Sequence, residues 1–273
     1  MAADPSGGSG NPGRDYGLLQ FRGADAHKFL QGQLSNDVNA LRAGELMLAG
    51  LHNPQGRVLA LLRLALLAPE HIVAVLPAEL AESTAAVLRR YVLRAKLQIG
   101  VERSAAAIAA LAAQLPPVAA LLEPEAHALH IAAGVPQVYA ATSGEFVAQM
   151  LNLDCIGAVS FDKGCYTGQE IIARAHYRGR TKRRMQRFAS IAPVALAAGE
   201  TVRLDDGRSA RIVDATALAD GRSEFLAVAP LELPAERASA ADAAAAGDAA
   251  AVGPAPARSL AAISLPLPYA LPD

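Results

Sequence analysis

Along the first hundred residues, apolar side chains recur either at every second position, as in a strand, or three and four positions apart, as in a helix. A strand is indicated by apolar and β-branched side chains at alternate positions, bounded by residues that favour turns. By this criterion the sequence predicts strands at residues 18–21, 45–51, 57–67, 71–76 and 97–101. The turn sequence Asn53-Pro54-Gln55-Gly56 separates the second strand from the third, so these two are expected to form a β-hairpin.

Two helices are predicted between these strands. Asp25 can cap the first helix, which Gly32 would close or kink. Pro77 suits the first position of the second helix, because the N–H that proline lacks has no partner inside a helix at that position. The packed face of this helix consists of residues spaced three and four apart, namely Leu80, Thr84, Val87, Leu88 and Tyr91. Helices packed on an antiparallel sheet predict an α+β fold.

Weaker signals of the same kind continue through residues 105–151, and the pattern changes after Arg187. Short alternating stretches at 187–191, 201–204, 210–214 and 224–228 are punctuated by glycine turns and predict a small β-barrel domain. Residues 236–257 are mostly alanine and are interpreted as a flexible linker before a returning strand at 259–265. We therefore divide the chain into a disordered lead-in at 1–14, an α+β domain at 15–185 and a barrel domain at 186–273.

The composition narrows the classes of partner. With 25 Lys and Arg against 26 Asp and Glu, the chain has almost no net charge, so any attraction for nucleic acid must be local. The beginning of the chain lacks the basic and apolar regions of a secretory signal. The longest apolar run, 58–68, is interrupted by Arg63 and is shorter than the ~20 residues of a membrane span. We therefore expect a cytoplasmic protein and, because no heptad pattern marks an interface, a monomer.

Cys165 lies in the segment where we expect the function, Lys163-Gly164-Cys165-Tyr166-Thr167-Gly168-Gln169-Glu170. Thr167 and Glu170 fit a capping box, which would place Cys165 just before a helix N-terminus. The partial positive charge at such an end, together with Lys163, favours the thiolate, so Cys165 is a candidate reactive or metal-ligating group. The alternative is an inert buried thiol. Cys155 is interpreted as a core residue, and a disulfide between the two cysteines is the less favoured reading.

A basic segment follows at residues 174–187, with seven Lys or Arg side chains and no acidic one, and with His176 and Tyr177 between them. Guanidinium groups pair with phosphate and carboxylate oxygens, so this segment could hold a phosphate, a polyglutamate tail or RNA. The alternative is a solvated face without a ligand. Gly179 is expected to end the helix that begins this segment.

A second polar cluster contains Gln33, Asn36 and Asp37, whose amides and carboxylate could line a pocket for a heteroaromatic ligand. Capping and turn formation explain residues 35–37 equally well. His127 and His130 have no partner at metal-ligand spacing and are taken as structural or exposed. The sequence contains no dinucleotide-binding, P-loop or Ser-His-Asp signature.

Four segments together resemble the YgfZ-type folate-binding proteins, which are relatives of the glycine-cleavage T-protein. They are 29–38, 53–57, 90–96 and above all 163–170, and they occur in the order that the family has. The resemblance covers about residues 18–187. It implies an aminomethyltransferase-like fold and a tetrahydrofolate-binding accessory protein that assists iron–sulfur cluster assembly or repair and thereby supports tRNA modification.

The resemblance also assigns residues. By position, Cys165 is the family's signature thiol, and in related eukaryotic proteins the matching cysteine is linked to cluster handling, which would make it a catalytic thiol or a transient cluster ligand. Iron–sulfur carrier or client proteins are the implied partners. The residues expected on the folate side are Gln33, Asn36, Asp37, Lys163, Tyr166, Gln169, Glu170 and Arg174.

Two features depart from the family pattern. Aminomethyltransferases carry a catalytic aspartate shortly after the turn at 53–56, whereas this chain has Val58-Leu59-Ala60-Leu61-Leu62 and so lacks that acid–base group. The alanine-rich residues 236–257 are also unlike a barrel hairpin. We therefore favour a folate-dependent accessory factor over a turnover enzyme, with an RNA-binding module and an aminomethyltransferase as the alternatives.

Overall fold

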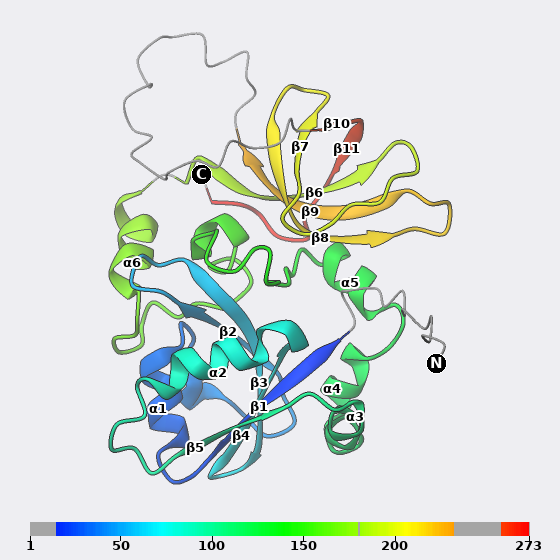
Figure 1. Ribbon diagram of the computed structural model, residues 1–273. Helices are drawn as coiled ribbons and strands as arrows, with labels where there is room; N and C mark the ends of the chain where they lie inside the picture. Colours follow the sequence, from blue (N-terminus) through cyan, green and yellow to red (C-terminus); the bar gives the residue numbers. More distant parts are fainter. Residues whose placement is uncertain (1–14, 180, 232–257, 273) are drawn as a thin grey trace, which may run out of the picture.

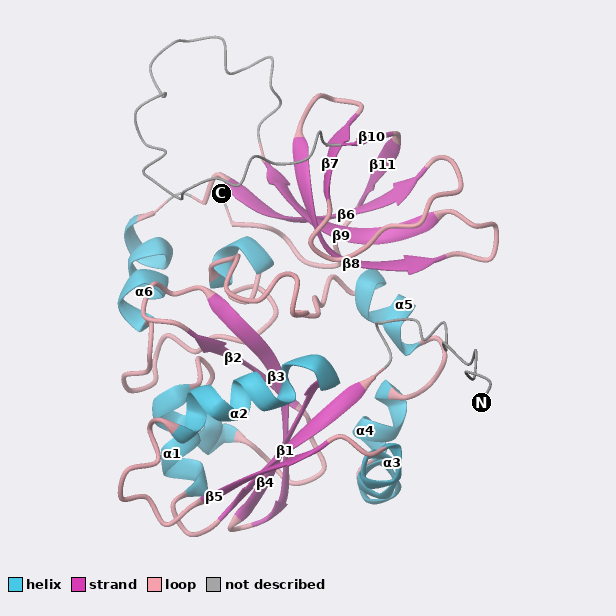
Figure 2. Cartoon of the chain, in the orientation of Figure 1, coloured by secondary structure: helices cyan, strands magenta, loops and turns pink. Residues whose placement is uncertain are grey.

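The computed structural model describes residues 15–179, 181–231 and 258–272, and two β-sheets dominate this part of the chain (Figure 1). Each sheet has helices or irregular segments packed against it (Figure 2). The segments at 1–14 and 236–257, for which a lead-in and a linker were predicted, lie outside the described residues.

The first sheet has five strands in the order β2-β3-β4-β1-β5, and every neighbouring pair is antiparallel. The predicted hairpin is confirmed, because β2 pairs with β3 across the turn at 53–56, where Gly56 has a φ of 73°. All five predicted strands are present, and their ends differ from the predicted ends by at most two residues. They are β1 (Tyr16–Arg22), β2 (Met47–His52), β3 (Val58–Ala68), β4 (His71–Pro77) and β5 (Gln98–Glu102).

The helices correct the sequence prediction at their ends. Gly32 does not close the first helix, and Pro77 ends a strand instead of beginning a helix, because a 3₁₀ turn separates it from α2. Residues 105–151 contain helices and no strand of either sheet. The bounds are α1 (Ala26–Gln33), η1 (Val38–Ala40), η2 (Ala78–Leu80), α2 (Ala81–Arg89), α3 (Ala105–Gln114), α4 (Pro116–Leu121), α5 (Ala126–Ala132), η3 (Ala148–Leu151) and α6 (Gln169–Arg178).

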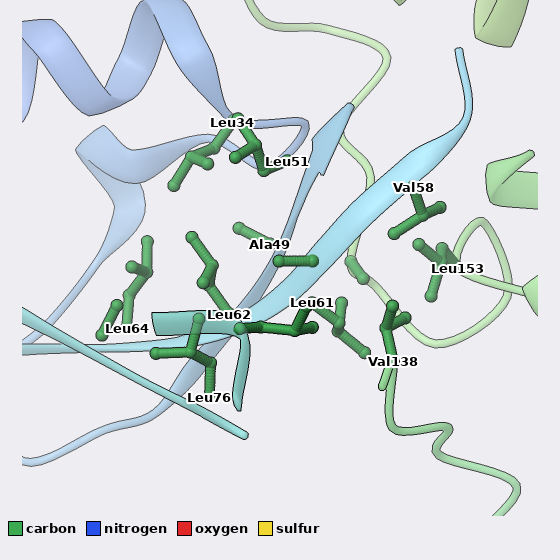
Figure 3. Close-up of a cluster of buried hydrophobic side chains, with 14 of the residues drawn as sticks. Leu34, Ala49, Leu51, Val58, Leu61, Leu62, Leu64, Leu76, Val138 and Leu153 are labelled. Carbon is green, nitrogen blue, oxygen red and sulfur yellow. The ribbon is translucent and has the colours of Figure 1, made fainter. Parts of the chain in front are cut away.

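The two faces of the first sheet belong to separate apolar clusters. Alternate residues of β1, β3 and β4 pack with α1 and α2 on one face, and the residues between them pack with α3 and α4 on the other. Figure 3 shows that the larger cluster extends from Leu62 and Leu64 of β3 to Val138 and Leu153, which lie in segments that are neither helix nor strand. The sheet is therefore buried on both sides.

The second sheet has six strands in the order β10-β7-β8-β9-β6-β11 and curves as a half-barrel. Its two edge strands, β10 and β11, are separated by Ala261 alone, so one short segment reaches both edges. A closed barrel at the C-terminal end remains a prediction. The strands are β6 (Arg183–Ser190), β7 (Thr201–Leu204), β8 (Ser209–Ala217), β9 (Ser223–Pro230), β10 (Arg258–Leu260) and β11 (Ala262–Leu265).

Candidate functional site

Cys165 is exposed and lies in the irregular segment that leads into α6. The predicted capping box does not form, because the residue that precedes α6 is Gly168 and no side chain caps the helix. Four positions separate Cys165 from Gln169, the first residue of the helix. The prediction that a capping box at Thr167 and Glu170 places Cys165 just before a helix N-terminus is therefore wrong. Cys165 also lacks the burial expected of an inert thiol.

Lys163 fixes the segment that carries Cys165. Its Nζ donates to the carbonyl oxygens of Gln31, Leu34 and Asn36 at 2.7, 2.5 and 2.9 Å. These carbonyls lie at and just beyond the end of α1, where a helix leaves its last carbonyl groups without partners. Burial lowers the pKa of Lys163 to about 8. One ammonium group thus joins two segments that are more than a hundred residues apart in the sequence.

Tyr166 fixes the same segment from the other side of Cys165. Its buried ring meets the ring of His52 edge-on at a centroid distance of 6.1 Å, and Lys163 Nζ lies 5.1 Å from the Tyr166 ring centroid. Burial raises the pKa of Tyr166 to about 12 and lowers that of His52 to about 4. Within the described chain, neither ring nitrogen of His52 has a hydrogen-bond partner, and the buried Oε1 of Gln33 also lacks one.

A glycine contact completes the attachment of this segment. Gly168 has a φ of 82°, and a Cβ there would lie 2.5 Å from the carbonyl oxygen of Asn53. The β2–β3 turn therefore packs directly on the start of α6. Cys165 is displayed from a short segment held at Lys163, Tyr166 and Gly168, which limits its movement.

Four of the eight residues expected on the folate side make contacts inside the protein, namely Asn36, Asp37, Lys163 and Tyr166. Asn36 Nδ2 donates to the carbonyls of Leu48 and Gly157, and Asp37 Oδ1 accepts from Gln31 Nε2 and from a backbone N–H. These side chains stabilise the turn that Lys163 grips, so the turn-forming reading of 35–37 describes their contacts. Three further candidates lie on α6, where one is half-buried and two are exposed, namely Gln169, Glu170 and Arg174.

The basic segment at 174–187 does not form one cationic surface. Arg184 is buried and pairs with Asp154 at 3.0 Å, and Arg187 pairs with Glu224 at 2.6 Å. Arg174 and Arg178 are exposed on α6, which ends before Gly179 as predicted. Charges that are adjacent in sequence are divided between a helix surface and the interior.

Cys155 is half-buried rather than fully packed in the core, and both cysteines are free thiols. Burial raises the pKa of Cys155 to about 11, and the charge of the adjacent Asp154 acts in the same direction. The disulfide considered from the sequence is absent from this structure, and its raised pKa makes the Cys155 thiol a weak nucleophile at neutral pH.

A buried polar cluster between the two sheets was missed by the sequence analysis. Arg63 on β3 donates to Gln137 Oε1, and Asp214 Oδ1 on β8 accepts from the Tyr139 hydroxyl at 3.1 Å and contacts His127 Nε2 at 2.8 Å. Arg63, Gln137 and Asp214 are only 3%, 4% and 2% exposed. The one available signal was Arg63, a charge inside an otherwise apolar strand. His127, which was expected to be structural or exposed, bonds to Asp214 in this cluster.

Among the described residues, no three His, Cys, Asp or Glu side chains are grouped closely enough to hold a metal ion. No helix in the described ranges is both long and apolar enough to cross a membrane.

Comparison with known proteins identifies the architecture. The chain matches no protein-family model. It is similar to the crystal structure of glycine cleavage system aminomethyltransferase T from Bartonella henselae, with a TM-score of 0.59 and 16% sequence identity over 80% of this chain and 76% of that one. The fold is aminomethyltransferase-like. At this identity the likeness establishes the fold alone, and the strand stretch at Ala60, where the sequence lacks the expected carboxylate, is fully buried and apolar.

Proposed function

We propose that this protein is a tetrahydrofolate-binding accessory factor for the assembly or repair of iron–sulfur clusters, acting as a monomer in the cytoplasm and supporting tRNA modification through cluster enzymes. The observation that carries the proposal is the contact of Lys163 with the turn after α1. It brings together two of the four segments that carry the resemblance to folate-binding proteins and leaves Cys165 exposed between its anchors.

The interior suits a folate. A pterin ring presents hydrogen-bond donors and acceptors along one edge and apolar faces above and below, so its site needs buried polar groups that lack protein partners. Gln137 Nε2 and Asp214 Oδ2 are buried without such partners in the described chain. Tetrahydrofolate would supply a one-carbon carrier to the protein.

Cys165 is suited to bind an iron–sulfur cluster that the protein passes on to another protein, and not one that it keeps. Thiolates are preferred ligands of iron–sulfur clusters, which require several of them. Cys165 is exposed and held in place, so it can offer one sulfur to a cluster whose remaining ligands belong to a carrier or client protein. Cys155, beside Asp154 and Arg184, is not displayed in this way.

The test combines folate binding with activity in cells. Anaerobic titration of the wild-type protein with tetrahydrofolate is expected to saturate, and Cys165→Ser should leave the affinity and the melting temperature unchanged. In cells, Cys165→Ser should lower the activity of cluster enzymes, whereas the matched change Cys155→Ser should not. Absence of folate binding, or full cluster-enzyme activity with Cys165→Ser, would contradict the proposal.

RNA binding through the basic segment makes a distinguishable prediction. The affinity of the wild-type protein for a tRNA pool would then fall steeply with salt and would not respond to folate. The burial of Arg184 and the pairing of Arg187 reduce the cationic surface available, so we expect only weak binding at moderate salt.

A further inference from the structure

A surface cleft lies between α3 and the face of the first sheet that α3 and α4 cover. Its volume is about 410 Å³, and α3 contributes Ala107, Ala110 and Leu111 to its wall. Protein interiors are closely packed, and alanine side chains fill less of the space between a helix and a sheet than larger side chains would. The short side chains of Ala107 and Ala110 therefore explain why space remains here. A volume of this size suits a small organic molecule.

The floor of the cleft is apolar. Leu18 of β1 and Val73 of β4 are buried and line the cleft from the sheet. Both belong, together with Leu111, to the apolar cluster beneath α3 and α4. A ligand in the cleft would place an apolar body on these side chains, and the removal of that body from water favours binding.

One end of the cleft is polar and cationic. Arg22 and His71 are directly opposite each other on β1 and β4, so their side chains project from the same face of the sheet, and both line the cleft. Nε and Nη2 of Arg22 both donate to Gln20 Oε1, at 3.1 and 2.6 Å, and this contact orients the guanidinium group. Among the described residues, no carboxylate pairs with Arg22. Its charge is therefore free to meet an anion.

His71 adds a buried polar atom that lacks a partner. Its Nε2 is buried, and no group of the described chain bonds to it. Burial lowers the pKa of His71, and the charge of Arg22 acts in the same direction, so the imidazole is neutral at neutral pH. A neutral imidazole donates from one ring nitrogen and accepts at the other. This end of the cleft thus offers N–H donors and a single positive charge.

We infer that the cleft binds a small apolar monocarboxylate, with the carboxylate at Arg22 and the aliphatic or aromatic body against Leu18 and Leu111. A guanidinium fork pairs with the two oxygens of a carboxylate. One positive charge balances a monoanion and leaves the second charge of a phosphate without a partner. The apolar floor offers no hydrogen bonds, so acids that carry hydroxyl groups along their length would lose hydration there without compensation.

This site is separate from the segment that carries Cys165. Lys163 contacts the turn after α1, and α1 packs on the opposite face of the first sheet. The cleft lies on the face that α3 and α4 cover. The inference therefore goes beyond the proposed function, and neither depends on the other.

Octanoate and octanamide test the polar end, because they share one apolar chain and differ in charge. Calorimetric titration of the wild-type protein with octanoate is expected to saturate, and octanamide should bind about fivefold more weakly. Arg22→Gln should remove this preference by weakening the binding of octanoate and not that of octanamide. The matched control is Arg222→Gln, on the β8–β9 turn, which should leave both affinities unchanged.

A second pair of variants tests the apolar part of the site. Ala107→Leu places a larger side chain in the wall of the cleft and should weaken octanoate binding about tenfold or more, because the space for the chain is then occupied. Ala106→Leu makes the same change at an exposed position of α3 that does not line the cleft, and it should bind octanoate like the wild type.

Two results would overturn the inference. The first is the absence of saturable octanoate binding by the wild-type protein. The second is octanoate binding that neither Arg22→Gln nor Ala107→Leu weakens, since the acid would then associate with another apolar surface. Melting temperatures identify any variant that fails to fold, and the exposed Arg22 keeps the test decisive if Ala107→Leu does not fold.

Discussion

The burial of His52 predicts that the protein loses stability in mild acid. Its side chain is 1% exposed, no protein group bonds to either ring nitrogen in the described chain, and burial lowers its pKa to about 4 from the ordinary 6.5. The unfolded chain therefore takes up a proton at a higher pH than the folded protein does. The stability that neutral His52 provides is fully present above the unfolded pKa and is lost as the pH falls toward the folded one.

The size of this effect follows from the separation of the two pKa values. A difference of about 2.5 units corresponds to about 3 kcal/mol once both states are protonated, and about 2 kcal/mol of this is lost between pH 7 and pH 5. His130, whose pKa burial also lowers to about 4, adds a similar dependence in the same range. The wild-type free energy of unfolding should therefore fall steeply below pH 6.

The contribution of His52 can be isolated by substitution. His52→Phe keeps an aromatic ring against Tyr166 and removes the titrating group. Urea unfolding of both proteins at several pH values between 7 and 5 gives the free energies, and the variant should lose about 2 kcal/mol less than the wild type over this interval. Equal losses in the two proteins would refute the reasoning, because His52 would then have the same pKa folded and unfolded.

Three further substitutions test the attachment of the Cys165 segment and the buried ion pair. Lys163→Met removes the ammonium group that donates to three carbonyl oxygens near the end of α1, and it should lower the free energy of unfolding in urea by about 2–4 kcal/mol. Proteolysis around residue 165 should become faster. Unchanged stability would show that water replaces the ammonium group. Gly168→Ala forces a side chain into a φ of 82° and against the carbonyl of Asn53, so its melting temperature should drop by several degrees, and a wild-type value would contradict the contact. Asp154→Ala leaves Arg184 buried without an opposite charge and should cost about 3–5 kcal/mol, whereas the double change Asp154→Ala with Arg184→Met should recover part of that loss.

Strand positions and the hairpin could be predicted because they depend on local chemistry. Alternation of apolar side chains and the Asn53–Gly56 turn act over a few residues, and β2 and β3 form as expected. The predicted helix ends were less accurate than the predicted strands. The sequence around Pro77 is compatible with a strand end or a helix start, and packing of β4 beside β1 decides for the strand.

The candidate site, too, could be predicted from the sequence only in part. Cys165 could be singled out from its segment, and its exposure agrees with a functional role. The roles of its neighbours could not be predicted, because Lys163 acts on carbonyl groups far away in the sequence. A backbone carbonyl has no sequence signature, so its need for a donor is visible only when the chain is folded.

The sequence by itself determined the sheet-forming segments and the order of the two halves of the chain, and it singled out the segment around Cys165 as the candidate site. Only the tertiary structure decided which charges become buried. Arg63, Arg184 and Asp214 come from different strands, and each is tolerated inside because a partner from a distant segment lies beside it. Burial of a charge depends on three-dimensional proximity, which no local spacing encodes.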